Sequence, residues 1–210
     1  MNFKPLLALA LLSGAMGVVV SDASAADLSV KGQIKPVGSC SLTLSNAGVI
    51  DLGELSRQTL DKHAGADRDM SLAVNCASPT KVAIKVVDNR EGSSFYGGWL
   101  GLGTPNIGSY TIRGDDKKGG LDGKQPITLT SWDDGSSWSH GRGGGLANDS
   151  HSGSPLTSRG DPDHAFPRFP VAFRTFTAAL QVDVYIHTPE LDFQDEIALD
   201  GSATLELVYL

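Results

Sequence analysis

The stretch DMSLAVNC, residues 69–76, decides the fold prediction for this chain of 210 residues. Met70, Leu72, Val74 and Cys76 alternate with polar or small residues. Because successive side chains of a β-strand point to opposite faces, this alternation predicts a strand with one buried face. The same parity turns Cys76 toward the interior, as a buried disulfide requires.

Several other stretches share this period of two. Their alternating residues are Leu28, Val30, Gly32 and Ile34; Val82, Ile84 and Val86; Leu180, Val182, Val184 and Ile186; and Ala203, Leu205, Leu207 and Tyr209. Residues 49–55, 107–114 and 126–130 are further candidates for extended chain. Many short strands with glycine and proline turn signals between them predict an all-β sandwich.

The first 25 residues are typical of a secretory signal peptide. Lys4 precedes the apolar stretch LLALALLSGAMGVVV, and Ala23, Ser24 and Ala25 form a small-residue cleavage site. We expect cleavage after Ala25, with a cut after Ala15 as the alternative. Residues 26–210 would then form a single exported domain, located in the periplasm or at the cell surface.

The two cysteines, Cys40 and Cys76, are the only ones in the chain. In an exported protein an even number of cysteines predicts a disulfide rather than two separate thiols. Neither cysteine has a Cys or His partner at metal-ligand spacing, so we expect no metal site. The net charge of −7, without a basic stripe, argues against a nucleic-acid partner.

Residues 132–165 are rich in Gly, Ser, Asp and His and hold few aliphatic residues. This composition predicts a long, exposed polar loop. The histidines of this stretch, His140, His151 and His164, are interpreted as part of that solvated loop rather than as metal ligands.

The stretch SWDDGSSW, residues 131–138, fits the Asp-box pattern of sialidases. A sialidase propeller needs repeated blades, and this chain has neither the repeat nor the length. We therefore predict a hairpin turn, in which Asp133 accepts backbone hydrogen bonds and Gly135 takes a positive φ. We expect no catalytic residues and no cofactor.

Three segments, KGQIKPVGSC, SLAVNC and ATLELVYL, resemble subunits of chaperone–usher fimbriae. The resemblance implies an immunoglobulin-like Greek-key sandwich that lacks its last strand, with a disulfide between its first two strands. It also implies a groove that accepts a donated strand. The groove wall would be Ala203, Leu205, Leu207, Tyr209 and Leu210, and the donor residues would be Leu28, Val30, Gly32 and Ile34.

A closer resemblance is to the GltF-like family of periplasmic proteins, a domain of unknown function often encoded near fimbrial chaperones and ushers. It is based on ADLSVKGQIKPVGSC, NAGVIDLGEL, VNCASPTKVAIKVVDNR, IGSYTI and LDGSATLELVYL. These segments span most of the mature chain outside residues 132–165. The family supplies no activity.

The leading hypothesis is a structural or accessory subunit of a fimbria with a role in adhesion. Its partners would be a periplasmic chaperone, an outer-membrane usher and other subunits. With cleavage after Ala25 the N-terminal extension is short, so the chain could accept a strand without donating, donate part of its own first strand, or be a complete monomeric domain.

Two other hypotheses are a carbohydrate-binding module and a glycosidase. The first would bind a glycan or host receptor through stacking on Trp99, Trp132 and Trp138, with Phe95 and Tyr96 nearby. The second lacks a visible set of catalytic residues.

Overall fold

The computed structural model describes residues 39–56, 60, 65–141, 145–147, 155–163, 168–187 and 196–210. The predicted signal peptide and the alternating stretch 28–34 lie outside these ranges. No helix in the described part of the chain is long and apolar enough to cross a membrane.

The described chain is nearly all β, with one short 3-10 turn, η1 (Ser45–Gly48). The strands are β1 (Cys40–Leu44), β2 (Gly65–Thr80), β3 (Val82–Asp88), β4 (Leu100–Gly101), β5 (Gly108–Leu121), β6 (Ile127–Ser131), β7 (Ser139–His140), β8 (Gly145–Ala147), β9 (Leu156–Gly160), β10 (Phe173–Ile186) and β11 (Ala203–Tyr209).

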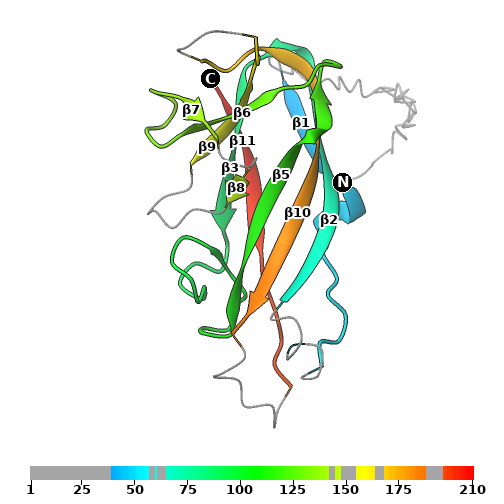
Figure 1. Cartoon of the computed structure of the whole chain (residues 1–210), viewed down its shortest axis with the longest axis vertical. Helices are drawn as coiled ribbons and strands as arrows, with labels where there is room; N and C mark the ends of the chain where they lie inside the picture. Colours follow the sequence, from blue (N-terminus) through cyan, green and yellow to red (C-terminus); the bar gives the residue numbers. More distant parts are fainter. Residues whose placement is uncertain are drawn as a thin grey trace, which may run out of the picture. The chain divides into compact units, whose positions relative to one another are not determined.

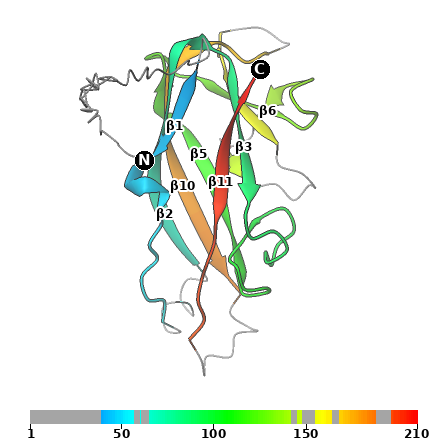
Figure 2. The same cartoon turned by 180° about the vertical axis from the view of Figure 1, so that it is seen from behind.

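These strands form two antiparallel sheets. The first sheet has the order β1-β2-β10-β5-β4, with β8 also paired to β5, and the second has the order β11-β3-β9-β6-β7. Figures 1 and 2 view the two sheets from opposite sides, so that β2, β10 and β5 are in front in one and β11 and β3 in the other. The predicted all-β sandwich is confirmed.

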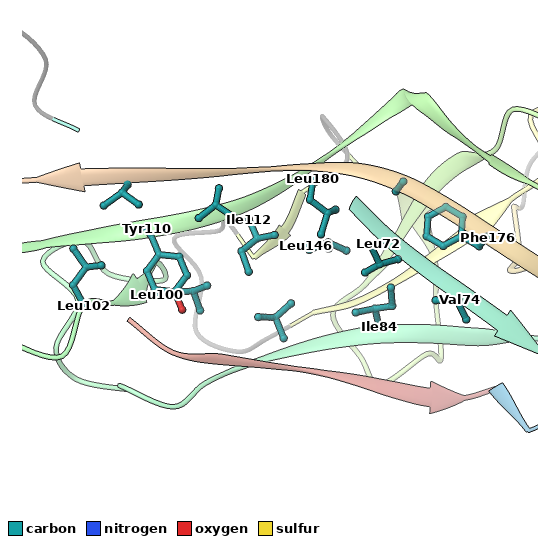
Figure 3. Close-up of a cluster of buried hydrophobic side chains, with 14 of the residues drawn as sticks. Leu72, Val74, Ile84, Leu100, Leu102, Tyr110, Ile112, Leu146, Phe176 and Leu180 are labelled. Carbon is teal, nitrogen blue, oxygen red and sulfur yellow. The ribbon is translucent and has the colours of Figure 1, made fainter. Parts of the chain in front are cut away.

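The long pair β2 and β10 forms the centre of the first sheet. Their register places Leu72 opposite Ala178 and Met70 opposite Leu180. The predicted alternation is confirmed in β10, where Leu180, Val182, Val184 and Ile186 are all buried. Figure 3 shows Leu72, Val74 and Leu180 of this sheet in one cluster with Ile84 of the second sheet. The core therefore lies between the sheets.

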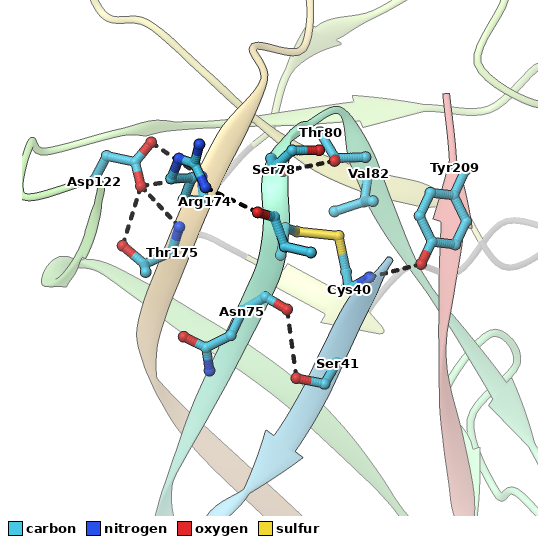
Figure 4. The surroundings of a disulfide bond; sticks show 12 residues. Cys40, Ser41, Asn75, Ser78, Thr80, Val82, Asp122, Arg174, Thr175 and Tyr209 are labelled. Carbon is cyan, nitrogen blue, oxygen red and sulfur yellow. Dashed lines mark hydrogen bonds between the residues drawn. A yellow bond between two sulfur atoms is a disulfide. The ribbon is translucent and has the colours of Figure 1, made fainter. Parts of the chain in front are cut away.

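The predicted disulfide between Cys40 and Cys76 is confirmed. The two cysteines are opposed in the register of β1 and β2, so the bond holds an edge strand to its only described neighbour. Next to it, the backbone N–H of Cys40 donates to the hydroxyl oxygen of Tyr209 at 2.9 Å (Figure 4). This contact joins β1 of the first sheet to β11 of the second.

The predicted polar loop over residues 132–165 is wrong in two places. Residues 145–147 form β8, which pairs with β5 and buries Leu146. Residues 156–160 form β9, which lies between β3 and β6, and all five are buried. Two of its polar side chains contact residues that are distant in the sequence. The Ser158 hydroxyl donates to the carbonyl oxygen of Val82 at 2.7 Å, and the Arg159 guanidinium lies 4.5 Å from the centre of the Phe176 ring.

Replacing both cysteines by serine, Cys40→Ser/Cys76→Ser, is expected to lower the free energy of unfolding by about 3–4 kcal/mol, because the open chain gains loop entropy when unfolded. The cysteines are 36 residues apart. Urea denaturation of the oxidised protein and the double variant measures the difference. An unchanged free energy of unfolding would contradict this role of the disulfide.

Candidate functional site

A groove of about 970 Å³ opens between the two sheets, beside the edge strands β1 and β11. Its floor is the inner face of the first sheet and the adjoining core. The floor residues are Leu102, Ile107, Tyr110, Ile112, Leu180, Val182, Val184 and Ile186, all buried. Burial raises the pKa of the Tyr110 hydroxyl well above its usual value, so this phenol stays neutral. The floor is therefore apolar and uncharged.

Two extended segments form the rims of the groove. The first follows η1 and contributes Ile50, Leu52 and Leu55; the second leads into β11 and contributes Ile197 and Leu199. These side chains are only partly buried, and exposed residues alternate with most of them. Figure 2 shows the two segments continuing from the β1–η1 region and into β11. The second rim thus alternates inward and outward side chains as a strand does, and the first rim does so from Ile50 to Gly53.

Neither rim segment belongs to a strand ladder among the described residues. Within the same ranges, β1 pairs only with β2 and β11 pairs only with β3. The Cys40–Tyr209 hydrogen bond brings the two edges together at one end of β11. Along the rest of the groove, the two rims flank an apolar floor, and neither rim forms a strand ladder with another described segment. Single backbone groups of the rims are bonded: the N–H of Asp200 donates to the carbonyl oxygen of Leu102, and the carbonyl oxygens of Asp51 and Leu52 accept from Arg68.

Among the described residues that line the groove, the charged ones are three carboxylates, Asp51 and Glu54 on one rim and Glu196 on the other. All three are exposed. In the described part of the chain, no His or Cys lines the groove, and no group of three or more His, Cys, Asp or Glu could hold a metal ion. The arrangement is suited to binding an extended apolar segment.

The structure places only part of the predicted C-terminal wall in this groove. Ala203 and Leu205 line it, whereas Leu207 packs against the core. Tyr209 is 55% exposed and extends to β1, and Leu210 lines a different pocket. Of the predicted wall, Leu207, Tyr209 and Leu210 therefore lie outside the lining of this groove. The predicted donor residues Leu28, Val30, Gly32 and Ile34 lie outside the described residues.

Sequence reasoning missed most of the rim. Ile50, Leu52, Ile197 and Leu199 were not among the predicted site residues, although the first two lie in a stretch predicted to be extended. Their alternation with exposed neighbours was the available signal. That these two segments, distant in the sequence, line the same groove depends on the tertiary structure.

The stretch SWDDGSSW forms the predicted hairpin turn between β6 and β7. The Asp133 carboxylate accepts hydrogen bonds from the Ser131 hydroxyl at 2.7 Å and from the backbone N–H and the hydroxyl of Ser137 at 2.8 and 2.6 Å. Gly135 has a φ of 88°, as predicted. The bonds from Ser137 and Ser131 stabilise the charged carboxylate and lower the pKa of Asp133 to about 2.

A second pocket, of about 470 Å³, lies where this turn meets the C-terminus. Its lining includes Trp138, Phe169, Tyr209 and Leu210. The indole N–H of Trp138 donates to the carbonyl oxygen of Gly135 at 3.1 Å, which fixes the ring against the turn. Phe169 is 57% exposed, so an apolar surface continues outside the pocket.

The structure does not bring Trp99 together with the other two tryptophans. Trp99 packs against Tyr96, which contacts Tyr185 near the end of β10. A hydrogen bond to Tyr185 raises the pKa of the Tyr96 hydroxyl. Trp138 instead lines a pocket with Phe169, just before β10 begins. The three predicted stacking residues therefore belong to two separate surfaces.

A comparison with known families finds that the N-terminal part of the chain matches one family model. The model is described as a protein of unknown function (DUF1120). Residues 28–117 match this model. The match ends within β5 and includes β1 with its disulfide and the first rim of the groove. Its description names neither the GltF-like group nor fimbrial subunits, and it carries no activity. No curated protein matches the chain.

The substitution Asp133→Asn is expected to destabilise the protein in a pH-dependent way. The folded-state pKa of Asp133 is lowered to about 2, so its stabilising effect is fully present above the unfolded-state pKa near 4 and is lost as the pH falls toward 2. Urea denaturation between pH 2 and pH 7 should show wild type and variant converging at the acid end. Asp134→Asn, at the next position of the same turn, is the control. A constant difference across this pH range would contradict the assignment.

Proposed function

We propose that this chain is a non-enzymatic structural or accessory subunit of a chaperone–usher fimbria. It would receive a strand from a partner in the groove between β1 and β11, and would contribute to cell adhesion as part of the fibre. The observation that carries the proposal is the apolar groove flanked by two backbone edges with no described partner.

The physical reason is that one added strand would satisfy both features at once. Its backbone would pair with an exposed edge, and its alternate side chains would fill the groove. Without such a strand, half-buried leucines and isoleucines along the rims remain in contact with water, at a cost of about 25 cal/mol per Å² of apolar surface.

The order of the strands supports an immunoglobulin-like arrangement. In the seven-strand form of that fold, strands A, B, E and D make one sheet and strands C, F and G the other. Here β1, β2, β10 and β5 correspond to the first set, and β3 and β11 correspond to C and F. The position of strand G, beside β11, is the position of the groove.

The resemblance of the chain ends to fimbrial subunits supports the choice of partners. A periplasmic chaperone would supply the strand after export, and another subunit would replace it after transfer to the usher. The signal-peptide pattern of residues 1–25 supports the route across the inner membrane.

The substitution Ala203→Trp tests strand acceptance in the groove. Ala203 lines the groove, so an indole there would occupy the space of a donated side chain. We expect co-purification with the periplasmic chaperone to fall at least about tenfold, as for overpacked binding sites. Pull-down from cells that express both proteins measures the effect.

The control is Glu206→Trp, which adds the same ring to the exposed side of the same strand. It should leave co-purification unchanged. A wild-type protein that is exported, stable and monomeric, and that never co-purifies with a chaperone, would rule out the subunit function.

A carbohydrate-binding role is the second candidate, favoured by the aromatic surface around the second pocket. Trp132 is 47% exposed, and Trp138, Phe169 and Tyr209 lie together in the pocket lining. Aromatic faces of this kind stack on the apolar faces of sugars.

A glycan array with the wild type, Trp132→Ala and Trp138→Ala tests this role, with Trp99→Ala as the control from a separate surface. Loss of glycan binding in the first two variants alone is the expected result. Absence of binding by the wild type, or equal binding by all variants, excludes the role.

A further inference from the structure

We infer that the groove selects a basic partner strand, in which apolar residues alternate with residues that include lysine or arginine. This inference rests on the proposed function and adds the chemistry of the partner. It follows from the charges at the rims, which are all of one sign among the residues that line the groove.

The three carboxylates lie on both sides of the opening. Asp51 and Glu54 belong to the rim after η1, and Glu196 belongs to the rim before β11. In the described part of the chain, none of the three takes part in an ion pair. The Asp51 carboxylate accepts one described hydrogen bond, from the backbone N–H of Gly53 at 2.8 Å.

Arg68 is the cation whose contacts lie closest to these residues. Its guanidinium donates to the backbone carbonyl oxygens of Asp51, Leu52 and Asp67, at 3.2, 3.3 and 2.9 Å. These hydrogen bonds all go to backbone oxygens, and Arg68 is not among the described residues that line the groove. The cation on the other side, Arg90, is paired with Asp200. With one cation bonded to the first rim and the other already paired, the lining of the groove is left acidic.

The geometry of a strand explains why these charges would act on the partner. If its alternate side chains enter the groove, the side chains between them point outward, past the rims. A lysine at such a position meets a carboxylate from one rim or the other. Opposite charges in this arrangement raise the rate and specificity of association, and an acidic strand is repelled.

The sequence of this chain contains a segment with this chemistry, which supplies a probe. In DLSVKGQIK, residues 27–35, the even positions hold Leu28, Val30, Gly32 and Ile34, and the odd positions include Lys31 and Lys35. A synthetic peptide of this sequence is the basic probe. The matched acidic probe carries Lys31→Glu and Lys35→Glu and keeps every apolar side chain.

The experiment refolds the purified mature protein from denaturant with each labelled peptide and measures binding by fluorescence anisotropy. The basic peptide should bind about tenfold more tightly than the acidic one at low salt, and the ratio should fall to about twofold in about 0.5 M NaCl. The triple variant Asp51→Asn/Glu54→Gln/Glu196→Gln should show the same loss of preference at low salt. Asn at position 51 keeps the acceptor for Gly53.

The possible results separate the two proposals. Equal binding of both peptides by the wild type overturns the charge selection and leaves strand acceptance in place. A preference that persists in the triple variant also overturns it, because the selecting charge would lie elsewhere. Binding of neither peptide overturns the proposed function together with the selection.

Discussion

Strands β1 and β11 each have a backbone edge that pairs with no other described strand, and the apolar groove lies between them. A peptide N–H or C=O group needs a hydrogen-bond partner once it leaves water. The half-buried apolar side chains of the rims need cover for the opposite reason, since their contact with water is unfavourable. These two requirements conflict for a lone chain and are met together by an added strand. The proposed partner, the groove and the acidic rims all follow from this constraint.

Two bonds near the C-terminal end of β11 hold the two sheets together there, and the groove lies away from this end. The disulfide fixes β1 to β2, and the Cys40–Tyr209 hydrogen bond fixes β1 to β11. Farther along, the chain before β11 and the chain after η1 diverge from the strand ladders and become the rims. The Asp133 turn lies nearby, and Gly135 of this turn lines one pocket together with Leu210. The turn therefore lies beside the C-terminal residue.

Period-two alternation was sufficient to predict β2, β3 and β10, because each buries a continuous row of aliphatic side chains such as Leu180, Val182 and Val184. It failed for β9, whose Thr157, Ser158 and Arg159 are all buried. Ser158 and Arg159 are held by a hydrogen bond to Val82 and a ring contact with Phe176, both distant in the sequence. The candidate site was predicted in part. Ala203 and Leu205 were expected as groove wall, whereas the meeting of residues 49–55 with residues 196–202 depends on contacts that local pattern does not encode.

Amide hydrogen exchange at the outer edge of β11 tests the central claim most directly. The relevant groups are the N–H groups of residues 203–209 that point away from β3. In the chain alone these amides should exchange at least about a hundredfold faster than those paired with β3, and they should become protected when a chaperone or donor peptide is bound. Strong protection of the same amides in the isolated monomer would show that the edge is already paired and would contradict the account.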